Sequence, residues 1–321
     1  MTKRILLIGA GQIGRRYLQG IINVIIPLDI FVLDQSLKSL EESKQFWLEE
    51  YTKSVEKKHS IQFINSLESI YKEFDITIVC TTADVRLMVI KDLLNNQLIK
   101  SKNWILEKVL VQSESQLQNL KLLFSKNNNV FVNMPRRAMK FHREVKDHFD
   151  TNVQYNAILE GSNWGLACNS LHFLDLFSWW TGETLIFINT NKLNDWFESK
   201  RKGFFDIRGT LEASFSRGSR LNLVSSQEQK DLILKINSKK NNFQLNITRG
   251  NFQINNKTII TGRELYQSQL TPIIIDNLLI NGASELTSLK FSIKQHKIFI
   301  KELMKHWNIN KNLNDITLPI T

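Results

Sequence analysis

A glycine-rich turn between an apolar strand and a helix stands at the start of this chain. Residues 4–8 read Arg-Ile-Leu-Leu-Ile, and the next six read Gly-Ala-Gly-Gln-Ile-Gly. In a strand–turn–helix unit of this kind, Gly9 permits the tight turn, Gly11 lets a ligand approach the backbone, and Gly14 lets the helix pack close to the strand. The pattern predicts a helix over 12–22 and a parallel α/β sheet that starts with the first residues.

The same turn predicts a site for a dinucleotide. Gln12 and Ile13 open the helix, and the N–H groups of a helix N-terminus bind phosphates. Asp34 ends a second apolar run about 20 residues after Gly14, where a carboxylate accepts hydrogen bonds from ribose hydroxyls. Because this carboxylate repels the extra phosphate of NADP, the sequence favours NAD as the cofactor. The alternative is a glycine-rich turn in an α/β protein that binds no dinucleotide.

The composition is that of a globular protein with two domains. The chain has 321 residues, more than one α/β core requires, and 42% of them are hydrophobic. No run of about 18 apolar residues predicts a membrane span, and the first strand begins too early for a signal peptide. Cys80 and Cys168 have no disulfide or metal-ligand spacing. We therefore expect a cytoplasmic protein with no metal and no membrane partner.

The net charge of +11 is compatible with nucleic acid, an anionic surface or an acidic small substrate. The lysines are scattered, and no basic stripe alternates with aromatic residues as in nucleic-acid-binding surfaces. A solvated surface explains the charge most simply, so nucleic acid is not expected as a partner. A basic balance also suits an anionic substrate such as a nucleotide sugar or a sugar acid.

Strand and helix alternate up to residue 133, which predicts a doubly wound parallel sheet. Strands are expected at 4–9, 29–33, 60–64, 75–81, 103–107 and 129–133, and helices at 12–22, 36–58, 66–72, 85–98 and 113–127. A sheet of this type binds its ligand at the carboxyl ends of the strands.

The pattern changes after Pro135. Helices are expected at 136–149, 170–180, 271–281 and 287–307, and short strands at 153–160, 184–190, 204–207, 210–216, 219–226, 231–237, 242–248 and 251–261. Such a series of strands predicts one large, mostly antiparallel sheet. The predicted architecture is α/β, with a Rossmann domain over 1–133 and an α+β domain for substrate binding and oligomerisation over 134–321.

Three further segments follow the glycine-rich turn in an order that resembles a known family. They are 80–82 at the end of the fourth expected strand, 107–109 at the end of the fifth, and 165–182, which contains an apolar helix and ends in Thr181-Gly182. This order and spacing resembles the Gfo/Idh/MocA family, named after glucose-fructose oxidoreductase, inositol dehydrogenase and MocA. The resemblance implies a Rossmann domain, a substrate domain with an open antiparallel sheet, a homo-oligomer, and oxidation, reduction or epimerisation of sugars, polyols and sugar nucleotides.

The resemblance also implies three catalytic residues. Lys108 matches the lysine of the family's Glu-Lys-Pro motif and would assist the departure of a proton from the reacting hydroxyl, although Val109 replaces the proline. His172 matches the family's histidine and is a candidate general base, and Asp175 matches the aspartate three residues later. Each has an ordinary alternative: a solvated lysine at a strand end, a core histidine, and an aspartate that orients the helix.

Further residues follow from the same resemblance. Thr81 and Thr82 would lie beside the nicotinamide ribose, and Glu107 near the nicotinamide, although a strand-end carboxylate is as often a local hydrogen-bond partner. Arg86 stands where the family often has a histidine, and an ordinary surface residue is the alternative.

The substrate contacts are expected to come from Lys108, His172, Cys168 and a pair of arginines. Arg136 and Arg137 match a family position that faces the substrate, where guanidinium forks could bind a phosphate or a carboxylate. A solvated helix start is the alternative for this pair.

Cys168 departs from the family pattern, because many catalytic members carry an aspartate four residues before the histidine. A structural thiol is the default interpretation of such a cysteine. Three alternatives follow from this departure. Either His172 and Lys108 suffice for proton transfer, or the protein catalyses a different reaction, or it is not catalytic. The sequence therefore predicts an NAD-dependent oxidoreductase that transfers hydride between nicotinamide and a carbinol carbon of a sugar or sugar derivative, with a nucleotide sugar of surface-polysaccharide assembly as one candidate. The alternative is a non-catalytic NAD-binding regulator with the same fold.

Overall fold

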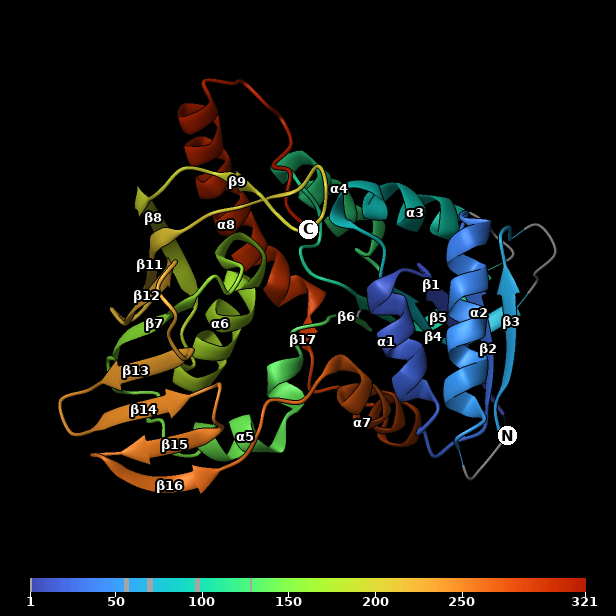
Figure 1. Cartoon of the computed structure of the whole chain (residues 1–321), viewed down its shortest axis with the longest axis horizontal. Helices are drawn as coiled ribbons and strands as arrows, with labels where there is room; N and C mark the ends of the chain where they lie inside the picture. The colour runs from blue at the N-terminus through green and yellow to red at the C-terminus, as the bar shows by residue number, and fades with distance from the viewer. Residues whose placement is uncertain (1, 55–57, 68–71, 96–98, 128) are drawn as a thin grey trace. The chain divides into compact units, whose positions relative to one another are not determined.

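A computed structural model of the chain describes residues 2–54, 58–67, 72–95, 99–127 and 129–321. Contacts among these residues divide the chain into two compact units, whose elements are labelled in Figure 1. Unit 1 comprises residues 1–110, 119–138 and 265–289, and unit 2 comprises 111–118, 139–264 and 290–321. No described helix is long and apolar enough to cross a membrane.

The described part of unit 1 is built on a seven-stranded sheet with the order β17-β6-β5-β4-β1-β2-β3. Six of these strands pair in parallel, and they are β1 (Lys3–Ile8), β2 (Leu28–Leu33), β3 (Ser60–Ile64), β4 (Lys72–Val79), β5 (Ile99–Leu106) and β6 (Val130–Val132). The helices wholly within this unit are α1 (Gln12–Ile21), α2 (Leu37–Tyr51), α3 (Ala83–Asn95) and α7 (Gln267–Asn281). Helix α4 (Glu114–Leu123) begins in unit 2 and ends in unit 1. This arrangement confirms the predicted doubly wound sheet.

Two predicted helices near this sheet differ from the structure. The helix expected from residue 287 begins at Leu289, because β17 (Thr287–Ser288) pairs antiparallel with Val132 and Phe131 of β6. Most of the helix expected at 66–72 lies outside the described residues, and its last residue, Lys72, begins β4. In the first case a pairing with a distant strand overrode the local helical pattern.

Helix α7 packs on α1 at Gly20. A Cβ atom at this position would lie 2.5 Å from the carbonyl oxygen of Ser268 and 2.5 Å from Cβ of Thr271. Asp276 of the same helix accepts a hydrogen bond from the N–H of Ile25 at 3.0 Å. The division of the chain is therefore less simple than one boundary after residue 133, because residues 265–289 belong with the N-terminal sheet.

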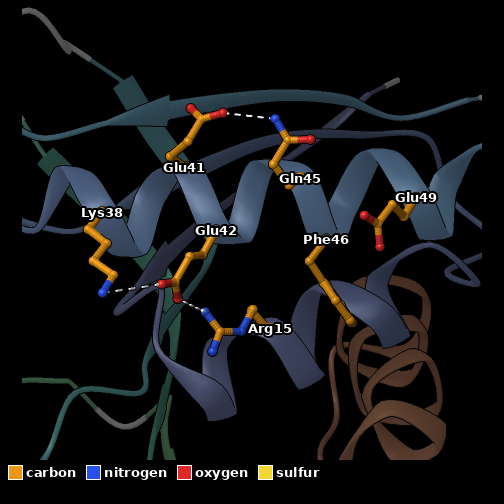
Figure 2. Close-up of a pocket in the computed structure, with 7 residues that line it drawn as sticks. All are labelled: Arg15, Lys38, Glu41, Glu42, Gln45, Phe46 and Glu49. Carbon is orange, nitrogen blue, oxygen red and sulfur yellow. Dashed lines mark hydrogen bonds and ion pairs between the residues drawn. The ribbon is translucent and has the colours of Figure 1, made fainter.

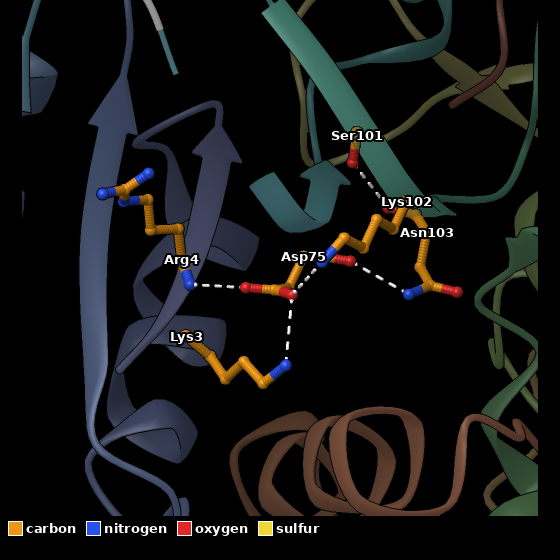
Figure 3. A network of polar contacts seen from close by, with 6 residues as sticks. All are labelled: Lys3, Arg4, Asp75, Ser101, Lys102 and Asn103. Atoms are coloured by element: carbon orange, nitrogen blue, oxygen red, sulfur yellow. Dashed lines mark hydrogen bonds and ion pairs between the residues drawn. The ribbon is translucent and has the colours of Figure 1, made fainter. Parts of the chain in front are cut away.

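A polar network around Asp75 joins β1, β4 and β5, as Figure 3 shows. Its carboxylate accepts hydrogen bonds from the N–H of Arg4 and from Nζ of Lys102, both at 3.0 Å, and Nζ of Lys3 lies 3.4 Å away. Asn103 donates to the backbone carbonyl of Asp75 at 3.0 Å. Burial alone would raise the pKa of Asp75, but these donors lower it below its usual value.

The unit 2 sheet, whose strands are all among the described residues, has eight strands in the order β16-β15-β14-β13-β7-β12-β11-β8. They are β7 (Asn156–Ser162), β8 (Leu185–Leu193), β11 (Gly209–Phe215), β12 (Arg220–Ser226), β13 (Ile233–Asn237), β14 (Asn242–Asn246), β15 (Asn251–Ile254) and β16 (Lys257–Thr261). β7 and β12 run parallel, whereas the other neighbours are antiparallel, which confirms the predicted sheet. β9 (Phe197–Glu198) and β10 (Phe205–Asp206) form a separate antiparallel pair. The sequence pattern predicted β10 within 204–207 but missed β9.

The helix expected at 136–149 is divided in two. Pro135–Ala138 form a 3-10 turn, η1, and α5 spans Lys140–Lys146, because Met139 between them has an extended backbone. The apolar helix α6 (Leu166–Thr181) packs on the sheet, with the rings of Phe177 and Phe215 centred 4.9 Å apart. The last helix, α8, spans Leu289–Lys311.

Gly20→Val should lower the free energy of unfolding by at least about 2 kcal/mol, because the new side chain meets the backbone of α7. Urea denaturation of the purified protein measures this loss. Arg16→Val, at an exposed position of the same helix, controls for the lower helix propensity of valine. Equal losses in the two variants would contradict the close packing at Gly20.

Asp75→Asn should cost about 1 kcal/mol of unfolding free energy at pH 7, as the charge-assisted contacts are lost. Because the folded pKa lies below the unfolded one, this stabilisation is present above the unfolded pKa, near 4, and disappears as the pH falls through the folded pKa. Denaturation at pH 7 and near pH 2 measures the difference between wild type and variant. A difference that does not shrink in acid would rule out this origin.

Candidate functional site

The glycine-rich turn has the geometry that its sequence predicts. Gly9 has φ +101°, a conformation that side chains with a Cβ rarely adopt. A Cβ at Gly14 would lie 2.0 Å from the carbonyl oxygen of Gly9, so the start of α1 rests directly on the turn. At Gly11, a Cβ would meet no atom within 4 Å. The turn therefore leaves space in front of Gly11 for a ligand.

Asp34 lies at this turn, as expected for neighbouring strands β1 and β2. One carboxylate oxygen accepts a hydrogen bond from the N–H of Ala10 at 2.7 Å, and the other accepts one from Ser36 at 2.8 Å. Ser43 fixes the same segment by donating to the carbonyl of Ala10 at 2.6 Å. A carboxylate has about four acceptor positions. Asp34 can therefore accept ribose hydroxyls in addition to the two amides.

The ends of β4 and β5 bring a second group of predicted residues together. Val79 and Leu106 are paired in the sheet, so Thr81-Thr82 and Glu107-Lys108 follow neighbouring strands. The buried hydroxyl oxygen of Thr81 has no hydrogen-bond partner within the described part of the chain. Lys108 is partly exposed, and its peptide bond to Val109 is cis.

The carboxylate of Glu107 is engaged inside unit 1. One of its oxygens accepts hydrogen bonds from the hydroxyl of Tyr17 at 2.7 Å and from the amide of Asn133, which also donates to Gln267 at 2.8 Å. Burial raises the pKa of Tyr17 well above its usual value, and the neighbouring Glu107 adds to the rise. These contacts match the local role considered for Glu107, and a contact with nicotinamide stays a prediction.

Arg86 is buried, so the alternative of a surface residue is wrong. Only 1% of the residue is exposed. Its guanidinium donates hydrogen bonds to the backbone carbonyls of Thr81, Val109 and Leu110, the last at 3.2 Å. Burial lowers the pKa of Arg86 to about 10, while the negative charge of Glu107 opposes this decrease. With a pKa of about 10, the guanidinium is charged at neutral pH.

Sequence reasoning missed the residues that hold these strand ends. Tyr17 lies on the buried face of α1, three residues after Gly14, and this periodicity could have placed it in the interior. Arg86 shares a face of α3 with Ala83, Ile90 and Leu93, so the same periodicity was a signal, although an arginine is seldom fully buried.

In unit 2, the predicted residues of α6 differ in exposure. The helix begins after Gly165, and Asp206 accepts a hydrogen bond from the N–H of Ala167 at 2.8 Å. Cys168 and His172 are partly exposed, whereas Asp175 is only 1% exposed. This burial favours the helix-orienting role for Asp175, while Cys168 and His172 stay candidates for substrate contact.

Arg136 and Arg137 lie in η1, and both are partly exposed. They belong to unit 1 with Lys108, whereas Cys168 and His172 belong to unit 2. A role for the arginine pair in binding an anionic group stays a prediction. The described residues contain no cluster of His, Cys, Asp and Glu that could hold a metal ion.

A surface groove of about 640 Å³ lies between α1 and α2. Figure 2 shows Glu42 of α2 between Arg15 of α1, 2.9 Å away, and Lys38, 4.0 Å away. None of the predicted cofactor or substrate residues lines this groove, whose lining is Arg15, Lys38, Glu41, Glu42, Gln45, Phe46 and Glu49.

No protein-family model and no curated protein matches the sequence. Solved structures do match over nearly the whole chain. A UDP-N-acetylglucosamine 3-dehydrogenase from Acidithiobacillus ferrooxidans is 11% identical with a TM-score of 0.68, covering 95% of this chain and 96% of its own. A scyllo-inositol dehydrogenase from Lactobacillus casei with bound NAD(H) and scyllo-inositol is 12% identical with a TM-score of 0.67, covering 97% and 98%.

A transcriptional regulator, Gal80p from Kluyveromyces lactis, is equally similar. It is 13% identical with a TM-score of 0.67, covering 97% of this chain and 93% of its own. Identities this low establish the fold alone. The chain has the fold of the Gfo/Idh/MocA dehydrogenases, as the resemblance in its sequence predicted.

Proposed function

We propose that the chain is an NAD-dependent oxidoreductase that transfers hydride between nicotinamide and a carbinol carbon of a sugar or sugar derivative. The observation that carries this proposal is the turn at Gly9–Gly14, which leaves open space at Gly11 and lies against Asp34. Similar structures that carry the names of sugar and inositol dehydrogenases support it.

The residues of unit 1 fit NAD. The space at Gly11 and the first amides of α1 suit a pyrophosphate, and Asp34 suits the adenosine ribose. The buried hydroxyl of Thr81, which lacks a partner among the described residues, suits a polar group near the nicotinamide. When bound, NAD supplies a carbon that accepts or donates hydride. The carboxylate of Asp34 favours NAD over NADP.

Lys108 and His172 are the proposed proton-transfer residues. Oxidation of a carbinol carbon releases the proton of its hydroxyl, and a neutral histidine can accept that proton near neutral pH. Lys108 would hydrogen-bond the same oxygen through its ammonium group and stabilise negative charge there. Because Cys168 supplies no carboxylate, His172 would act without the aspartate seen in many family members.

Lys108→Met and His172→Asn should each lower kcat by about 10²-fold or more, the usual contribution of proton transfer, and leave NADH affinity nearly unchanged. Nicotinamide absorbance follows turnover on panels of sugars, sugar acids and nucleotide sugars, the last included because the +11 charge suits anionic substrates. Exposed Lys100→Met and His148→Asn serve as matched controls. Full turnover in both active-site variants would refute these roles.

A non-catalytic NAD-binding regulator is the second candidate. It is favoured by the thiol of Cys168, in place of a carboxylate, and by the equal similarity to Gal80p. Tight NADH binding by the wild type with no turnover across the whole panel would support the regulator. Turnover of any one substrate would exclude it.

Gly11→Val should lower NADH affinity by more than about tenfold while leaving the melting temperature nearly unchanged. The added methyl groups enter space that the protein leaves open, and Gly11 has a φ of −72° that any residue adopts. Titration of NADH fluorescence measures the affinity, and Gly11→Ala should give a smaller loss. Unchanged affinity in Gly11→Val would place the dinucleotide elsewhere.

A further inference from the structure

Arg86 connects the two segments that follow β4 and β5. It lies in the first turn of α3, and one nitrogen of its guanidinium donates to the carbonyl of Thr81. Another nitrogen donates to the carbonyls of Val109 and Leu110. Two of the three carbonyls that Arg86 binds therefore belong to the two residues directly after Lys108, the proposed proton-transfer residue.

The burial of this cation is energetically costly. An ion removed from water loses favourable hydration, and hydrogen bonds and opposite charge must replace it. Three backbone carbonyls and the nearby charge of Glu107 provide the compensation, and Glu107 is itself held by Tyr17 and Asn133. A side chain without donors at this position would leave the three carbonyls unsatisfied, which is unfavourable for buried groups. The guanidinium thus joins the segment after β4 to the segment after β5 through these hydrogen bonds.

We propose that Arg86 is a positioning residue, which fixes the backbone after Lys108 against the segment that contains Thr81. This inference rests on the proposed function and deepens it. The planar guanidinium suits the task, because its N–H groups point in fixed directions and reach three carbonyls at once. A lysine ammonium carries the same charge on a flexible stem and cannot reproduce this fork.

Arg86→Lys is therefore the informative variant, measured alone and combined with Lys108→Met. Alone, it should lower kcat about tenfold or more, since small displacements of catalytic groups cost up to about 10²-fold, while KM for NAD changes less than kcat. In the Lys108→Met background, it should cause less than about twofold further loss, because a positioning residue acts through the residue that it positions.

Arg86→Met and the exposed Lys91→Met, both on α3, complete the series. Arg86→Met should reduce kcat at least as much as Arg86→Lys, and Lys91→Met should leave kcat and melting temperature unchanged. The melting temperature of each variant is measured as well. A lower kcat with an unchanged melting temperature indicates displacement of the backbone after Lys108 and not unfolding.

The inference is overturned if Arg86→Lys keeps the kcat of the wild type. It is also overturned if the losses of Arg86→Lys and Lys108→Met multiply, as they would for a purely structural role. Failure of the proposed function is recognised separately, in the wild type. A wild type that does not bind NADH, or that binds it without turnover of any substrate, overturns the proposed function and the positioning role with it.

Discussion

The contact between Gly14 and the carbonyl of Gly9 determines where α1 lies, and much of unit 1 depends on that helix. With the backbones this close, α1 has one position relative to β1. The helix then carries Tyr17 to Glu107 and Gly20 to α7. The same close approach thus fixes the glycine-rich turn at one end of α1 and the packing of α7, a helix distant in the sequence, at the other.

The sequence predicted those features whose signals are local. A strand, three glycines and Asp34 at the expected distance were enough to place the turn, and alternating patterns identified both sheets. It could not predict the pairing of Thr287-Ser288 with β6 or the packing of α7 on unit 1, because these depend on residues far away in the chain. The burial of Arg86 was missed for the same reason, since its three acceptors are backbone carbonyls that carry no sequence signature.

The two units differ in how far their residues agree with the predicted chemistry. In unit 1, the turn, Asp34 and Thr81 all have geometry suited to a dinucleotide. In unit 2, the buried Asp175 and the thiol of Cys168 leave His172 as the one predicted proton acceptor on α6. Cofactor binding is thus better supported than turnover, which is why the regulator stays a specific alternative.

The late position of α7 in the sequence has a consequence for how the chain can be divided. A ribosome completes all eight strands of the large antiparallel sheet before it reaches residues 265–289, yet these residues finish the parallel sheet's unit. A fragment that ends at residue 138 would leave Gly20 uncovered and the edge of β6 open. Unit 1 is therefore not a module that can be transplanted by a single cut, because a graft of it needs both stretches of chain.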